Sequence, residues 1–130
     1  MKVIYEYPPN IEKIKKVLSI PESGVVFTYG DTIYNPSKGT IDELLEKHEE
    51  VHMKQQTDPE EWWSRYLTDI TFRASQELEA YRAQYKEAKK VIKDRNILFK
   101  YLKLLAKDFS SEQYGNPMSF EQAIKEIQTT

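Results

Sequence analysis

The order of apolar and polar residues predicts a short β-rich region followed by a series of helices. β-Rich runs occur at residues 3–7, 25–29 and 32–34, and Gly30-Asp31 between the last two suits a type II′ hairpin turn. Apolar residues at helical spacing predict one helix before this hairpin and five after it. Their expected ranges are 10–18, 40–56, 59–68, 70–93, 94–109 and 119–128.

Two helix boundaries in this series depend on capping residues. Thr40-Ile41-Asp42-Glu43 has the form of a capping box, which predicts a helix that begins after Thr40 as N-cap. A single helix over residues 59–93 would be roughly 50 Å long, too long for a domain whose radius of gyration is about 14 Å. We therefore expect a break at Thr68-Asp69, where Asp69 can cap the next helix. These elements predict a mainly helical α+β fold with a small antiparallel sheet, in a single domain over residues 1–130.

The composition fits a folded domain without thiol chemistry. Hydrophobic residues make up 39% of the chain and there are 9 Tyr, which argues against disorder. The absence of Cys excludes disulfides, a thiol nucleophile and Cys-ligated metal. With 19 Lys and Arg against 21 Asp and Glu, the net charge of −2 does not suggest a nucleic-acid partner. No apolar run could span a membrane and the N-terminus does not resemble a signal peptide, so we expect a cytoplasmic protein without a membrane partner.

The only two histidines, His48 and His52, stand four residues apart, and Glu49 follows the first. Residues four apart on a helix lie on one face, one turn apart, so both imidazoles can reach one metal ion. Glu49 lies about 100° around the helix, where its carboxylate can take a proton from metal-bound water without binding the metal. This H-E-x-x-H zinc motif arises by chance in roughly one of five hundred such sequences. The alternative is a surface helix whose two histidines are solvated among charged neighbours.

A catalytic zinc site takes a third protein ligand and keeps one position open. With no further His and no Cys in the chain, that ligand must be a carboxylate. In the helix predicted over 70–93, Glu77 lies within the apolar stripe, whereas Glu79 points to roughly the opposite side. A buried carboxylate is costly unless it is paired or bound to a metal, so Glu77 is the predicted third ligand. The alternative is an ion pair between Glu77 and Arg73 or Arg82.

His48-Glu49-x-x-His52 followed by Glu77-x-x-Ala80-Tyr81 resembles the gluzincins, the thermolysin-like metallopeptidases. The length of the chain is also similar to that of the minimal, single-domain gluzincins. The resemblance implies a zincin-like fold, in which an active-site helix is followed by a glutamate helix. It further implies Zn²⁺ as cofactor, with His48, His52 and Glu77 as ligands and Glu49 as the general base that acts on a zinc-bound water.

Two positions depart from the gluzincin pattern. Where the family has an Asp that braces a ligand histidine, this chain has Tyr81. No third histidine is present to stabilise an oxyanion, which leaves Tyr81, Tyr85 and Arg82 as candidates. The resemblance also implies a substrate that lies extended along a sheet edge, at residues 25–29 or 32–34.

The chain also resembles small uncharacterised bacterial and bacteriophage proteins over nearly its whole length. The segments that carry this likeness are Phe27–Tyr34, His48–Gln56, Trp62-Trp63, Glu77–Gln84 and Tyr114-Gly115-Asn116. We expect a zinc-dependent metallopeptidase that acts on a peptide or protein substrate, in a bacterial cell, a phage-infected host or a virion. The alternative is a non-catalytic or weakly active phage or prophage structural or accessory protein that keeps a zincin fold. A third alternative is a partner-binding module that uses the lysine-rich segment 86–107; the sequence predicts no oligomeric state.

Overall fold

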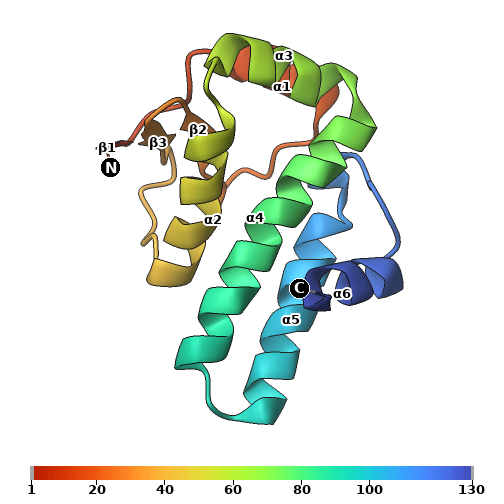
Figure 1. Ribbon diagram of the computed structural model, residues 1–130. Helices are drawn as coiled ribbons and strands as arrows, with labels where there is room; N and C mark the ends of the chain where they lie inside the picture. The colour runs from red at the N-terminus through yellow and green to blue at the C-terminus, as the bar shows by residue number, and fades with distance from the viewer. Residues whose placement is uncertain (1, 130) are drawn as a thin grey trace.

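The computed structural model describes residues 2–129, and its three short strands lie at one end of a mainly helical molecule (Figure 1). Strands β2 (Phe27–Tyr29) and β3 (Thr32–Tyr34) form the expected antiparallel hairpin, in which Thr28 is opposite Ile33. Gly30 in the turn has φ 65°, a conformation that favours glycine. The predicted hairpin is therefore confirmed.

The sheet is mixed, so the prediction of an antiparallel sheet is wrong for its third strand. Strand β1 (Lys2–Ile4) pairs in parallel with β3, and the strand order is β1-β3-β2. Helix α1 (Ile11–Val17) lies between β1 and the hairpin in the chain. This crossover returns the chain so that β3 runs in the same direction as β1, as parallel pairing requires.

Five further helices and one turn of 3-10 helix follow the hairpin. They are α2 (Glu43–Gln55), α3 (Pro59–Thr68), α4 (Ile70–Val91), α5 (Arg95–Phe109), η1 (Glu112–Tyr114) and α6 (Phe120–Gln128). The predicted break between α3 and α4 is confirmed, because the Asp69 side chain accepts a hydrogen bond from the Phe72 amide. Helix α2, however, begins later than the capping box predicts. Asp42 and not Thr40 is its N-cap, since the Asp42 carboxylate accepts from the Leu45 amide at 2.8 Å.

Two hydrophobic cores lie on either side of the contact between α2 and α4. The first joins α1, β2 and α3, and its buried residues are Ile14, Leu18, Val25, Phe27, Trp62, Trp63, Tyr66 and Leu67. The second joins α4, α5 and α6, and its buried residues are Tyr81, Tyr85, Leu102, Leu105, Ala106, Phe109, Ala123 and Ile127. Helix α2 runs beside α4 (Figure 1).

The mainly helical α+β class is as predicted. Within residues 2–129, none of the helices has the combination of length and apolar character that crossing a bilayer requires.

Candidate metal centre

Three buried side chains from α2 and α4 meet at one point. His48 Nε2 lies 3.1 Å from Glu77 Oε1, and His52 Nε2 lies 3.2 Å from the same oxygen. All three residues are only 4–5% exposed. The structure thus brings together the three residues predicted as metal ligands, in a group that could hold a metal ion. Glu79, the rejected candidate, is exposed on the same helix.

The outer nitrogen of each imidazole is bound to a glutamine. His48 Nδ1 donates to Gln84 Oε1 at 3.0 Å, and His52 Nδ1 donates to Gln55 Oε1 at 2.8 Å. A carboxamide oxygen can only accept, so each Nδ1 carries its hydrogen. When the rings are neutral, each Nε2 therefore carries a lone pair, which points at Glu77 Oε1.

The glutamines are themselves held in this orientation. The amide nitrogen of Gln84 donates to the Tyr101 hydroxyl at 2.8 Å, and that of Gln55 donates to the Gln76 carbonyl at 3.1 Å. The Gln76 carbonyl can only accept, so this bond fixes which end of the Gln55 carboxamide faces His52. From the sequence, Gln55 is predicted to be a hydrogen-bonding residue at the helix end, on the face of His48 and His52, whereas Gln84 was missed as a site residue. Gln84 follows Glu77 by seven residues, so helical phase alone places it on the same face of α4.

The arrangement requires a positive charge at its centre. Two imidazole lone pairs, at 3.1 and 3.2 Å from one carboxylate oxygen, are repelled by it unless a cation or a proton lies between them. In a tetrahedral zinc site with bonds near 2.0–2.1 Å, adjacent ligand atoms lie about 3.3–3.4 Å apart. Both nitrogen–oxygen distances are close to this value, the three ligand atoms lie within 4.8 Å of one another, and two His with one Glu is a ligand set that zinc uses in catalytic sites. The residues therefore fit a zinc ion.

Without a metal, a proton supplies the positive charge. Burial alone lowers the pKa of His52, but the charge of Glu77 and its hydrogen bond outweigh burial and raise that pKa from 6.5 to about 9. Burial alone would raise the pKa of Glu77, but His52 and His48 hold it well below its usual value. A protonated His52 and an ionised Glu77 thus form a buried ion pair in the metal-free protein.

The second oxygen of Glu77 is occupied by a tyrosine. Tyr66 at the end of α3 donates to Glu77 Oε2 at 2.6 Å. Burial, followed by the nearby charge of Glu77, raises the pKa of Tyr66 well above 10, which keeps the hydroxyl a donor. This bond leaves Oε1 alone to face the histidines. The role of Tyr66 could not be found from the sequence without knowing how α3 packs on α4.

Neither Arg73 nor Arg82 pairs with Glu77, so the alternative prediction of an ion pair between Glu77 and one of these arginines is wrong. Arg73 is buried, and its guanidinium donates to backbone carbonyls at the end of α3 and to the carbonyl of Tyr114. Arg82 donates to the Glu126 carbonyl at 2.8 Å and lies 3.4 Å from its carboxylate, on α6.

Glu49 lies at the flank of the three-residue cluster, as the helical phase of the motif predicts. Its Oε2 is 3.9 Å from His48 Nε2, and its Oε1 accepts from the Thr28 hydroxyl at 2.8 Å. The residue is 5% exposed. The bond to β2 holds the carboxylate beside the cluster but outside direct contact with it, which suits a base better than a ligand.

Of the three predicted oxyanion candidates, only Tyr81 reaches the cluster. Its ring packs edge-on against His48 at a centroid distance of 4.5 Å, and its hydroxyl donates to that of Tyr114 at 2.9 Å. Tyr85 belongs to the second hydrophobic core, and Arg82 faces α6. Tyr81 does not hydrogen-bond a ligand histidine; Gln84 braces His48 instead.

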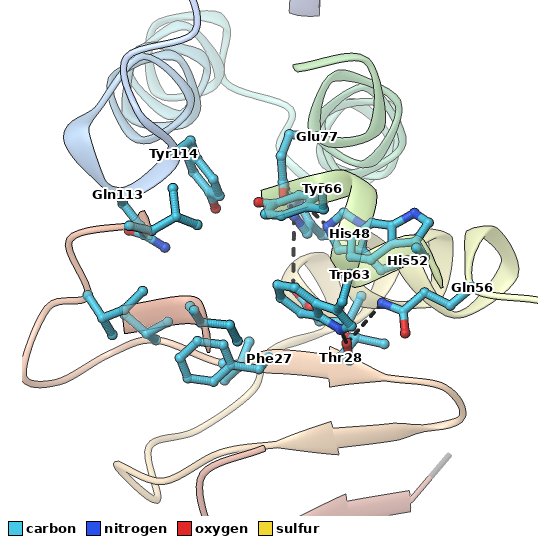
Figure 2. Close-up of a pocket in the computed structure, with 17 residues that line it drawn as sticks. Phe27, Thr28, His48, His52, Gln56, Trp63, Tyr66, Glu77, Gln113 and Tyr114 are labelled. Carbon is cyan, nitrogen blue, oxygen red and sulfur yellow. Dashed lines mark hydrogen bonds and ion pairs between the residues drawn. The ribbon is translucent and has the colours of Figure 1, made fainter. Parts of the chain in front are cut away.

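Two pockets open onto the cluster, and residues of α4 contribute to the lining of both. The apolar pocket, with a cavity volume of about 50 Å³, is walled mainly by α1, β2 and α3 (Figure 2). The polar pocket, of about 290 Å³, extends towards the end of α5. Residues common to both are Val25, Val26, His48, Glu49, Gln113 and Tyr114. Figure 2 shows Gln113 and Tyr114 across the apolar pocket from His52 and Gln56. The sequence analysis quoted Tyr114 only as part of a likeness and gave it no role.

The expected substrate edge is restricted by the strand order. Strand β3 is central, so residues 32–34 cannot form a free edge, and that alternative is wrong. Strand β2 is an edge strand, but its Thr28 carbonyl already accepts from Gln56 at 2.9 Å and from the Trp63 indole at 3.0 Å. The chain just before β2, at residues 25–26, lines both pockets and remains the candidate for substrate contact.

Comparison of the chain with protein-family models, curated proteins and solved structures found no match. The resemblance to gluzincins therefore stays a prediction, and function is argued from the geometry of the cluster and its pockets.

Proposed function

We propose that the protein is a zinc-dependent peptidase of gluzincin type, which hydrolyses a peptide bond in the cleft formed by the two pockets. The observation that carries this proposal is the convergence of His48 Nε2, His52 Nε2 and Glu77 Oε1, with the Glu49 carboxylate beside them. Structural zinc sites are usually closed by four protein ligands, whereas catalytic sites have three and an open position. Three ligands next to open pockets therefore support catalysis over a structural role.

In the proposed reaction, Glu49 and Thr28 act beside the metal site. A zinc ion at the cluster supplies a Lewis acid for the scissile carbonyl and for the attacking water. Glu49 takes a proton from that water and passes it to the leaving amine. The Thr28 hydroxyl, which donates to Glu49 Oε1, keeps the other carboxylate oxygen directed at the cluster.

Tyr114 takes the role that Tyr85 and Arg82 were expected to fill. It lines both pockets, and its hydroxyl accepts a hydrogen bond from Tyr81. Burial, together with nearby acidic groups, raises the pKa of Tyr114 well above 10, so it keeps its proton to donate. A hydroxyl that accepts one bond and donates another can stabilise the negative charge that develops on the carbonyl oxygen.

The test starts with metal analysis of protein purified without an affinity tag, followed by digestion of a peptide library. One zinc per chain and cleavage at defined bonds are the expected results. Glu49→Gln should keep zinc and the fold but lower the cleavage rate about a hundredfold or more, because it removes the general base. Glu50→Gln is the matched control, since Glu50 pairs with Lys47 on the same helix.

Three outcomes contradict the proposal or its role assignments. Absence of zinc shows that the protein is not a zinc-dependent peptidase. Stoichiometric zinc without cleavage of any peptide favours the non-catalytic accessory protein. Loss of zinc in Glu49→Gln shows that Glu49 is a ligand and not a base.

A further inference from the structure

The two pockets differ in the charge of their walls. The apolar pocket is formed largely by aliphatic and aromatic side chains, among them Ile14, Leu18, Ile20, Val25, Phe27 and Trp63. The polar pocket contains two carboxylates, those of Glu49 and Asp108, and none of its described lining residues is a lysine or arginine. Glu49 has a hydrogen-bonding partner in Thr28, which leaves the Asp108 carboxylate as the free negative charge of this pocket.

Asp108 stands at an unfavourable place in its helix. It lies in the last turn of α5, which ends at Phe109, where the negative end of the helix dipole disfavours an acidic side chain. Its neighbour Ser111 donates twice to its backbone carbonyl. The ion pairs within residues 2–129 engage other carboxylates, those of Glu49, Glu50, Glu77, Glu87 and Glu126. Local features that lower stability without compensation are expected where a residue serves function.

We infer that the polar pocket binds a basic side chain of the substrate, lysine or arginine, with Asp108 as its partner. The inference rests on the proposed peptidase function, because both pockets meet at the metal cluster. The negative end of α5 and the Asp108 carboxylate act together on a cation. The side-chain carbonyl of Gln113, which also lines the polar pocket, can accept a further hydrogen bond from the basic group.

The first experiment measures binding without cleavage. Two peptides, both acetylated and amidated, share a leucine-centred sequence that is flanked on both sides by lysine in one and by glutamine in the other. Calorimetric titration into zinc-loaded Glu49→Gln should give about tenfold tighter binding of the lysine peptide, as for one charge-assisted hydrogen bond. Adding Asp108→Asn should remove the difference. Asp94→Asn is the matched control: it changes the charge of the same helix equally, and Asn still caps its N-terminus.

The second experiment uses the active protein and a peptide library. Cleavage sites should be enriched in lysine or arginine at one fixed position, and Asp108→Lys should shift the enrichment to acidic residues there. Equal binding of both peptides, or a lysine preference that persists after Asp108→Asn, overturns the inference. A lysine preference that appears only with peptides whose amino terminus is free overturns the inference as well, because the terminal ammonium group would then take part in binding. Lysine-selective binding without any cleavage supports the basic-residue pocket and rejects the peptidase function. Cleavage without a preference for basic residues supports the peptidase function and rejects the pocket.

Discussion

Glu77 is a buried carboxylate that requires a positive charge close to it. Its carboxylate is 4% exposed, accepts one bond from Tyr66, and turns its other oxygen to two imidazole nitrogens. In the metal-free protein, proton transfer to His52 satisfies this oxygen. A divalent cation satisfies it and both histidines at once.

The first prediction at this scale compares Glu77 with Glu79. Glu77→Gln should weaken zinc binding by at least 10–100-fold, the loss typical of residues that merely support ligands. Glu79→Gln should change zinc affinity little, because Glu79 is exposed and its only described bond is to the Gln55 amide at 3.2 Å. Competition with a chelator measures both affinities. The reverse order would show that the ligand assignment on α4 is wrong.

The second residue-scale prediction concerns the glutamine that braces His48. Gln84→Leu should lower zinc affinity about 10–100-fold, because loss of the bond from Nδ1 frees the ring orientation and tautomer. The fold should survive with a loss of about 1–3 kcal/mol, since the buried His48 Nδ1 loses its acceptor. Gln128→Leu, at the exposed end of α6, is the control for a glutamine outside the site. Unchanged zinc affinity in Gln84→Leu would mean that packing against Tyr81 alone orients His48.

At the scale of elements, α2 differs from the other long helices. Its buried residues are His48, Glu49 and His52, all polar, whereas α5 buries Leu102, Leu105, Ala106 and Phe109. Apolar burial is the main favourable term that holds most helices to a core. Helix α2 therefore depends unusually strongly on its polar cluster for attachment to α4.

Zinc should consequently protect α2 against hydrogen exchange more than any other helix. On chelation, peptides covering residues 43–55 should exchange faster, because the cross-link between α2 and α4 is lost and local opening becomes easier. Peptides covering residues 95–109 should exchange at the same rate with and without zinc. Exchange measured by mass spectrometry decides this. A uniform change over both helices would show that zinc stabilises the molecule only as a whole.

Relations within one element could be predicted from the sequence, and relations between elements mostly could not. The spacing of His48 and His52 and the phase of Glu77 follow from helical geometry, and so does the break at Asp69. The contributions of Tyr66 and Tyr114 depend on how α3 and η1 pack against α4. The parallel pairing of β1 was missed for the same reason. Thr40 failed as a cap because the helix begins two residues later, where Asp42 is extended and its carboxylate accepts from the Leu45 amide.

On the scale of the whole molecule, the cluster of His48, His52 and Glu77 lies between two hydrophobic cores, since His48 packs on Tyr81 of the second core and His52 on Trp62 of the first. The first core holds α1, β2 and α3, the second holds α4, α5 and α6, and the ligands lie where α2 meets α4. A cation at this junction should therefore contribute to global stability, with a pH dependence set by the proton that it replaces.

The stability of the metal-free protein and the stabilisation that zinc adds should change with pH in opposite directions. The folded-state pKa of His52 is raised from 6.5 to about 9, so its contribution to stability is complete below pH 6.5 and is lost as pH rises towards 9. The depressed pKa of Glu77 contributes above its usual range and does not change within this window. Metal-free protein should thus lose up to roughly 3 kcal/mol of unfolding free energy between pH 6.5 and 9. Zinc must displace the proton, so its stabilising effect should grow over the same window.

Thermal and urea unfolding at pH 6.5, 7.5 and 8.5, with chelator and with buffered zinc, measure both trends. His52→Ala removes the proton site and serves as the control, in which both trends should be nearly flat. Metal-free stability that rises with pH would mean that His52 is neutral in the folded protein. A zinc effect that falls with pH would mean that zinc binds at a site whose ligands do not include His52, and the assignment of the cluster would then have to be abandoned.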